Sequence, residues 1–352
     1  PIELLVDHWE GIPYFFATKK GNLPFDILSA AFFLLTRYEE YLHHEAHPST
    51  PFAARDSVGY EYHFLELPIV DIWVEKFRNA LVEKYPNLTF APREASTVSV
   101  IEVAKAFKYK HKGILRTLLR GLTHFFTLQW TQLGELLRVV MGRSKDPFDF
   151  YEALIDFFQE RKLHPTFFFL LGDYNYYDQG LSYNNVRYKY LIKHIADYAI
   201  VSVLGSYDAT SREEILLKER ERMSNIINRP VRRFRANNNL LPLPELYQHL
   251  AATEFKEDYT MGYLSHIGFR AGTCTPYIFY DIRLEVQIPI VVHSFALHWQ
   301  HIDKQCTKET LYLIETIKQQ VADLKGDFIS IFSPEYLSKA PNRFSLYKKV
   351  VN

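Results

Sequence analysis

The sequence predicts an α/β fold, with a small α+β domain in residues 1–92 followed by a (β/α) barrel in residues 93–352. Apolar strands alternate with amphipathic helices throughout the second part, which is typical of a parallel sheet, either doubly wound or closed into a barrel. About seven strand candidates with irregular connections occur there, and this favours the barrel. The pattern changes at Pro92, where we expect the domain boundary.

Two helices are expected in the N-terminal domain. Segment 26–42 (DILSAAFFLLTRYEEYL) has apolar residues at spacings of three and four, so it is predicted as a helix whose charged end faces solvent. Segment 68–85 is predicted as a second helix, which ends before Pro86.

The second domain contains the elements of the predicted barrel. The expected strands are Val98–Val103, Thr166–Leu171, Ile200–Leu204, Val231–Phe234, Glu254–Glu257, Ile288–Phe295 and Phe328–Phe332. The expected helices are Phe150–Lys162, Tyr188–Tyr198, Ser211–Ile227, Leu243–Ala252 and Lys308–Leu324. Strand sequences such as TFFFLL are apolar on both faces, as buried parallel strands are.

Segment 113–141 is a predicted helical insertion with a broad apolar stripe beside Arg116, Arg120 and Arg138. Such a helix can lie on a membrane, pack across a barrel end or form a dimer contact. Because Lys plus Arg (41) equals Asp plus Glu (41), the chain has no net field toward anionic membranes or nucleic acid. We therefore expect no nucleic-acid partner and no membrane association, and a homo-oligomer through 113–141 is a possible assembly.

Two cysteines, Cys274 and Cys306, do not form a disulfide framework, which favours a reducing compartment such as the cytoplasm. The sequence shows no signal peptide and no apolar run of membrane-spanning length. The chain begins at Pro1 rather than Met, so an export signal upstream would also be compatible with it.

Catalytic groups of barrel enzymes project from the C-terminal ends of the strands. Metal-dependent hydrolysis needs about three His or carboxylate ligands and a base. The strand ends offer only Glu102, Asp258, His293 and His298, and the spacing of His293, His298 and His301 does not place all three on one face. The sequence therefore predicts no metal site.

Four stretches stand out as possible family signatures: the expected helix 25–42, AFKYKHKGILRTL at 106–118, segment 146–178, and EDYTMGYLSHIGFRAGTCTPYIFYDI at 257–282. Together they resemble the NodB-homology polysaccharide deacetylases that carry a small domain before the barrel, and the stretch at 257–282 is the most specific match. The resemblance implies a distorted barrel of about seven strands. It also implies removal of acetyl groups from N-acetylated glycans, with a divalent metal such as zinc held by one Asp and two His and with a second Asp as base.

The chain departs from this family at the positions that carry the chemistry. The Asp-x-Asp of the first strand corresponds to Glu102-Val103-Ala104, and the metal-binding His of the third strand corresponds to Leu204. Two further His positions correspond to Asn237 and Ser333. The resemblance thus implies a degenerate site without metal or other cofactor. If the chain is active, Glu102, Arg235 and Asp258 are the candidate catalytic residues.

Five residues are candidates for ligand binding: Tyr176, Tyr177, Tyr207, Asn238 and Arg270. The tyrosine-rich loop 173–190 has the aromatic faces and amides of a glycan platform, although a surface loop packed by its own rings fits equally well. Segment 237–239 offers amides for sugar hydroxyls, or forms a turn. Asp258 and Arg270 are expected to form a buried ion pair.

Three functions are compatible with these observations. The first is a non-catalytic deacetylase homologue that binds a glycan or a protein partner through the cleft that corresponds to the family's active site. The second is an active metal-dependent deacetylase with unusual ligands. The third is a structural subunit of a larger assembly, and the fold alone does not choose among the three.

Overall fold

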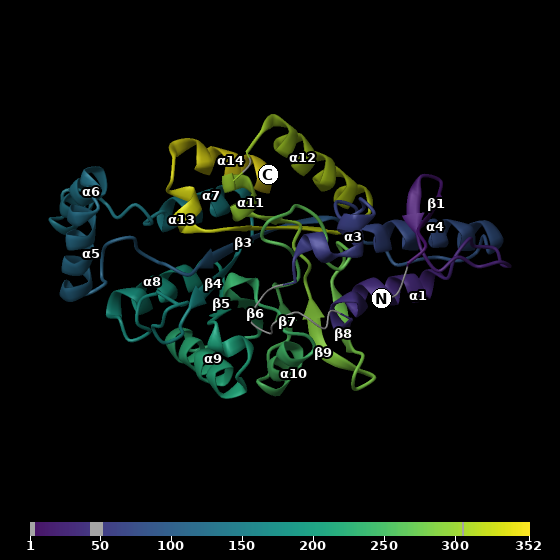
Figure 1. The fold of residues 1–352 in the computed structure, drawn as a ribbon, viewed down its shortest axis with the longest axis horizontal. Helices are drawn as coiled ribbons and strands as arrows, with labels where there is room; N and C mark the ends of the chain where they lie inside the picture. The colour runs from purple at the N-terminus through teal and green to yellow at the C-terminus, as the bar shows by residue number, and fades with distance from the viewer. Residues whose placement is uncertain (1–3, 43–51, 305) are drawn as a thin grey trace.

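The computed structural model describes residues 4–42, 52–304 and 306–352, and it shows a mixed α/β protein (Figure 1). Within these residues the main sheet has nine strands in the order β10-β11-β3-β4-β5-β6-β7-β9-β8. Neighbouring strands are parallel except β8 and β9, which are antiparallel. The predicted α/β class and the large, mostly parallel sheet are thereby confirmed.

The strands are β1 (Asp7–Trp9), β2 (Ile12–Tyr14), β3 (Ser96–Val103), β4 (Thr166–Leu170), β5 (Ile200–Gly205), β6 (Arg233–Ala236), β7 (Glu257–Asp258), β8 (Tyr277–Asp281), β9 (Val286–Val292), β10 (Leu297–His298) and β11 (Asp327–Phe332). β1 and β2 form a separate antiparallel hairpin. The strand expected at Glu254–Glu257 begins at Glu257 instead, because Glu254 has a left-handed backbone (φ 59°) that ends the preceding turn.

The α-helices are α1 (Ile27–Leu35), α2 (Tyr38–Tyr41), α3 (Val58–Glu61), α4 (Ile69–Lys84), α5 (Ile114–Phe126), α6 (Trp130–Val140), α7 (Tyr151–Arg161), α8 (Val186–Ala196), α9 (Glu213–Ile227), α10 (Glu245–Ala252), α11 (Trp299–Lys304), α12 (Lys308–Asp323), α13 (Pro334–Leu337) and α14 (Pro341–Val351). Short 3₁₀ turns occur at Ala54–Asp56, Asp208–Thr210 and Asn237–Asn239. Figure 1 shows α12 and α14 on one side of the sheet and α8, α9 and α10 on the other.

The main sheet is strongly curved. One apolar cluster on its inner face joins side chains from β3, β4, β5 and β11 with Tyr259 and Phe295. The segment between β9 and β10 forms backbone hydrogen bonds with two different parts of the sheet. The Phe295 N–H donates to the carbonyl of Met261, which follows β7 (2.9 Å), and the Ala296 N–H donates to the carbonyl of Ile329 in β11 (3.0 Å). The C-terminal ends of the parallel strands therefore converge on a common space.

The predicted helix at 26–42 is wrong in its second half. α1 begins where Asp26 caps the Ser29 N–H, and it ends at Leu35. Arg37 then adopts a left-handed backbone (φ 58°) before the short α2. The reason is electrostatic: the buried Arg37 guanidinium pairs with Glu39 (2.5 Å) and Glu40 (2.8 Å), so the charged residues turn inward rather than face solvent.

The insertion 113–141 consists of two helices, α5 and α6, that pack against each other beside a turn at Leu128 (φ 55°). Figure 1 places them at the end of the molecule opposite to β1 and α4. No helix in the described ranges is both long and apolar enough to cross a membrane.

Candidate functional site

Glu102 lies near the C-terminal end of β3, and the alternation of side chains along this strand directs it to the inner face. Val98 and Val100, at the preceding positions of the same parity, pack in the inner apolar cluster. Ala104 follows and packs against the same cluster. The strand therefore leads from an apolar interior to a single carboxylate at the mouth.

Three nitrogen donors surround the Glu102 carboxylate. Trp299 Nε1 donates to its Oε1 at 2.6 Å, and Arg235 Nε donates to its Oε2 at 3.1 Å. His298 Nε2 lies 3.1 Å from Oε1. Burial alone would raise the pKa of Glu102, but the facing His298 and Arg235 and these hydrogen bonds lower it well below its usual range. Glu102 is thus a stable anion rather than a proton acceptor.

His298 is held as a neutral hydrogen-bond donor. The Gln300 N–H donates to His298 Nδ1 at 3.2 Å, which leaves the ring proton on Nε2, facing Glu102. Burial lowers the pKa of His298, against the opposing effect of Glu102. The imidazole therefore orients the carboxylate without carrying charge itself.

Arg235 is also locked in place. Its Nη1 donates to the Tyr259 carbonyl at 2.8 Å, and its guanidinium lies 5.0 Å from the centroid of the Phe295 ring. A fixed positive charge therefore sits next to Glu102, where it opposes the approach of a metal cation. No group of three or more His, Cys, Asp or Glu side chains suited to hold a metal ion occurs among the residues that the structure describes.

A cleft of about 220 Å³ opens above this cluster, and we call it the Glu102 cleft. It is lined by Glu102, Ala104, Lys105, Leu170, Tyr177, Gln179, Arg235, Asn237, Asn238, Leu264, His298, Trp299, Gln300 and Glu335. The fold thus brings together several of the predicted site residues, namely Glu102, Ala104, Arg235, Asn237, Asn238 and Tyr177.

Buried Asp178 fixes the tyrosine-rich loop against the cleft. Its carboxylate accepts from Asn237 Nδ2 (2.8 Å) and from the Tyr207 N–H (2.8 Å). Tyr207 in turn stacks on Tyr177, with ring centroids 4.0 Å apart and planes 12° apart. Tyr176 is 84% exposed and does not line the cleft, although its ring meets the Tyr177 ring edge-on, with centroids 5.3 Å apart.

The remaining predicted positions lie outside the cleft lining. Leu204 is buried in the inner apolar cluster. Ser333 caps α13, where its Oγ accepts from the Tyr336 N–H at 3.2 Å. The expected Asp258–Arg270 ion pair is wrong. Asp258 accepts from the Tyr247 hydroxyl (3.0 Å), and Arg270 pairs instead with Glu40 (2.6 and 2.9 Å) because the inward turn at Arg37 brings Glu40 to it.

Several lining residues were not among the predicted catalytic or ligand-binding residues: Lys105, Gln179, Leu264, Trp299, Gln300, Glu335 and His298, which was considered only as a metal ligand. His298 and Trp299 do carry a sequence signal, because His298 is the last residue of β10 and Trp299 directly follows it. Testing His298 only as a metal ligand conceals its role, which is to donate to a carboxylate. Lys105 likewise follows Ala104 at the end of β3.

Residues 1–86 match DUF7033, a family of unknown function. The match ends before β3, the strand that carries Glu102. No curated protein matches the chain.

Solved structures similar to the chain include a proposed polysaccharide deacetylase from Mycobacterium smegmatis, with 14% identity and a TM-score of 0.46 over 75% of this chain and 85% of that one. A CE4 family pseudoenzyme from Bacillus anthracis has 10% identity and a TM-score of 0.37, over 74% of this chain and 62% of that one. A mutant of it with restored enzymatic activity has 11% identity and a TM-score of 0.32, over 74% and 64%. Activity differs among proteins that share a fold, so it has to be argued from the site.

The fully buried carboxylate of Glu219 predicts a pH effect on stability. Burial raises the pKa of Glu219 on α9 to about 7, although its Oε2 accepts from the Ser206 N–H at 3.0 Å. A raised pKa in the folded state means that stability is full below the unfolded value of 4.5 and is lost as pH rises through about 7. The contribution of Glu219 to the free energy of unfolding should therefore be lower at pH 8 than at pH 5, by roughly 1–3 kcal/mol, as measured by urea unfolding of the wild type and of a variant without this carboxylate.

Glu219→Gln, which mimics the neutral carboxyl, should remove most of this difference and be the more stable protein at pH 8. Glu214→Gln on the exposed side of α9 is the matched control and should leave the pH profile unchanged. Equal pH profiles for the wild type and Glu219→Gln would contradict the assignment.

Proposed function

We propose that this chain is a catalytically degenerate homologue of the polysaccharide deacetylases that binds an N-acetylated glycan through the Glu102 cleft. The observation that carries the proposal is the state of Glu102. Its two oxygens already accept hydrogen bonds from Trp299, His298 and Arg235. A carboxylate in this state is a poor base, and the neighbouring guanidinium disfavours a metal ion.

The other altered positions support the same proposal, because each side chain has a different structural use. Leu204 fills the inner apolar cluster, where it offers no ligand atom. The Asn237 amide is committed to Asp178, and the Ser333 hydroxyl caps a helix. A metal ion that activates a water molecule would need several free protein ligands at these places. We accordingly propose that no cofactor is bound.

The curvature of the sheet supports a distorted barrel of seven strands as the finer description of the fold. β3, β4, β5, β6, β7 and β11 would each supply one strand, and the continuous segment from β9 to β10 would supply the seventh, since it bonds toward both β7 and β11. We also propose residues 1–92 as a separate domain. A distinct apolar cluster that contains Phe15, Phe33 and Trp73 supports it.

Glycan binding is favoured by the chemistry of the cleft lining. Tyr177 and Trp299 offer aromatic rings, on which sugar rings commonly stack. The exposed Asn238 and the side chains of Gln179 and Gln300 offer amides to hydroxyl and acetamido groups. Such a lining also suits a protein partner, which is the alternative occupant.

The exposed surface of α5 and α6 supports a second candidate role, in assembly. α5 and α6 expose many large apolar side chains, among them Leu118, Leu122, Phe126 and Trp130. An exposed apolar patch of this kind is typical of an interaction surface. A homo-oligomer through 113–141, or a purely structural role in a larger assembly, would use this surface rather than the cleft.

The test measures binding of an N-acetylglucosamine oligomer by calorimetry and acetate release with added zinc. We expect saturable binding without acetate release. Tyr177→Ala and Asn238→Gly should each weaken binding about tenfold, a loss of roughly 1.4 kcal/mol. Glycine is chosen for position 238 because the native φ is 56°, which alanine tolerates poorly.

Tyr312→Ala is the control, since Tyr312 is a 76% exposed tyrosine on α12 that does not line the cleft. Its affinity should equal that of the wild type. Acetate release that a chelator stops would establish the active-enzyme alternative. Oligomer affinity that Tyr177→Ala and Asn238→Gly leave unchanged would exclude the cleft as the binding site.

A further inference from the structure

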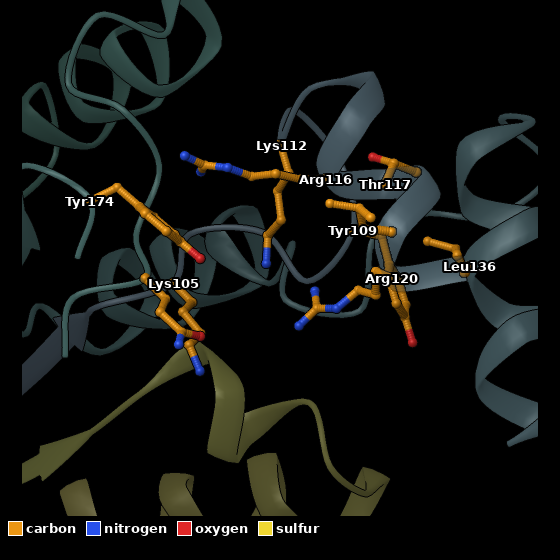
Figure 2. Close-up of a pocket in the computed structure, with 10 residues that line it drawn as sticks. Lys105, Tyr109, Lys112, Arg116, Thr117, Arg120, Leu136 and Tyr174 are labelled. Carbon is orange, nitrogen blue, oxygen red and sulfur yellow. The ribbon is translucent and has the colours of Figure 1, made fainter. Parts of the chain in front are cut away.

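A second cavity, also of about 220 Å³, lies between α5, the loop that follows β3 and the loop that follows β4. Its lining residues are Lys105, Tyr109, Lys112, Arg116, Thr117, Leu119, Arg120, Leu136, Tyr174 and Gln179. We call it the basic pocket, because four of these side chains are cations and none is a carboxylate. Figure 2 shows Lys105, Lys112 and Arg120 directed toward one space beside Tyr174.

Asp146 and Glu335 lie near enough to offset part of the Lys112 charge, but the acidic side chains around the pocket form no ion pair with its cations. Glu135 is already engaged by Lys108 Nζ (2.6 Å) and by the Tyr109 hydroxyl (2.8 Å). Asp146 accepts from the backbone N–H groups of Lys108, Tyr109 and Lys110 (2.8 to 2.9 Å). In the described part of the chain, no ion pair joins Lys105, Lys112, Arg116 or Arg120 to a carboxylate.

The cations are positioned by other contacts. The Arg116 guanidinium lies 3.9 Å from the centroid of the Tyr174 ring, and Arg120 Nη1 donates to the Lys108 carbonyl at 2.7 Å. Burial, together with the charges of Arg120 and Lys105, lowers the pKa of Lys112 to about 8. Holding like charges together in a partly enclosed space is unfavourable, and a bound anion would remove this cost.

We propose that the basic pocket binds the phosphate group of a ligand. A phosphate monoester carries about two negative charges near neutral pH and three acceptor oxygens, which match several lysine and arginine donors. A single carboxylate would leave most of the positive charge uncompensated. Thr117 and Gln179 add uncharged donors to the lining. This inference does not depend on glycan binding in the Glu102 cleft.

Two sources of the phosphate fit the surroundings. Lys105 and Gln179 line both the basic pocket and the Glu102 cleft, so a soluble sugar phosphate could occupy both. α5 also exposes Leu118, Leu122 and Phe126, so a lipid headgroup could enter while these side chains meet the membrane interface. The phosphate chemistry is the same in both cases.

The first measurement titrates inorganic phosphate into the full chain by calorimetry. We expect saturable binding, which Lys112→Met and Arg116→Gln each weaken about tenfold or more. Lys349→Met, at an exposed position on α14, is the matched control and should bind like the wild type. Because Lys112 is a disfavoured charge in the folded protein, Lys112→Met should raise the Tm measured without phosphate. Phosphate affinity that is the same in Lys112→Met and the wild type would overturn the proposal.

The second measurement distinguishes the sources. The chain is sedimented with phosphatidylcholine vesicles, with and without phosphatidic acid. Sedimentation that requires phosphatidic acid and is lost in Lys112→Met supports the pocket with a lipid phosphate as ligand. Binding of free phosphate without sedimentation supports it with a soluble phosphate ester. If the chain unfolds cooperatively but neither binds free phosphate nor sediments with phosphatidic acid vesicles, the proposal is also overturned.

Discussion

Replacement of Glu102 with alanine is expected to lower the free energy of unfolding by about 3–5 kcal/mol. The side chain is the common acceptor of Arg235, His298 and Trp299, all of which would lose a partner in a largely buried place. Arg235 would become a buried cation without a counter-charge. Urea unfolding followed by fluorescence and circular dichroism would measure the loss.

Glu102→Gln should fall between the wild type and the alanine variant, since its amide oxygen still accepts one donor but carries no charge. Glu335→Gln, at the rim of the same cleft, is the matched control and should change the free energy of unfolding by about 0.5 kcal/mol or less. If Glu102→Ala were as stable as Glu335→Gln, the carboxylate would have no structural role.

The cluster also has a defined pH dependence. The folded-state pKa of Glu102 is depressed, so its contribution to stability is present above its usual value of 4.5 and is lost as pH falls toward the folded value. The pKa of His298 is lowered as well, so protonation in the unfolded chain below 6.5 acts in the same direction. The part of the free energy of unfolding that Glu102 and His298 contribute should therefore decrease as the pH falls below 6.5.

The second large effect is expected at the contact between Arg270 and Glu40. Arg270→Ala should cost about 3 kcal/mol, because the buried Glu40 carboxylate loses a two-point ion pair and keeps only its contact with Arg37 (2.8 Å). Both side chains are almost fully buried, and they join the N-terminal segment to the loop that follows β7. Chemical denaturation of the full chain is the measurement.

A double-mutant cycle makes the prediction specific. Glu40→Gln with Arg270→Met should be less destabilised than the sum of the single changes, with a coupling energy of about 1–3 kcal/mol. Arg283→Ala is the control, since its pair with Glu245 lies on the surface and should contribute about 1 kcal/mol or less. Additive effects at Glu40 and Arg270 would show that the pair does not act as a unit.

The basic pocket and the Glu102 cleft differ in the balance of charge among their lining residues. The cleft is electrically balanced, because a carboxylate is matched to a guanidinium and the imidazole is neutral. The basic pocket has a surplus of positive charge and no acid in its lining. A neutral glycan suits the first and a phosphate suits the second, although Lys105 lines both.

Local patterns were sufficient for the class of the fold and for most of its elements. Apolar runs such as TFFFLL are buried on both faces in β4, and the period of three and four in Lys308–Leu324 becomes α12. These features depend on neighbours within a few residues, which the sequence displays directly. Glu102 was likewise found as a carboxylate at a strand end, because strand ends meet at one edge of a parallel sheet.

Long-range charge pairing could not be read from such patterns. Arg37 ends α1 because its guanidinium meets Glu39 and Glu40 inside the protein, and Glu40 meets Arg270, 230 residues further along the chain. Glu102 meets His298, 196 residues away. A buried charge takes whichever partner the folded chain brings within hydrogen-bond distance, and spacing along the sequence does not encode that choice. Element types thus followed from the amino-acid order, whereas the partners of the buried ions were settled by the packing of distant segments.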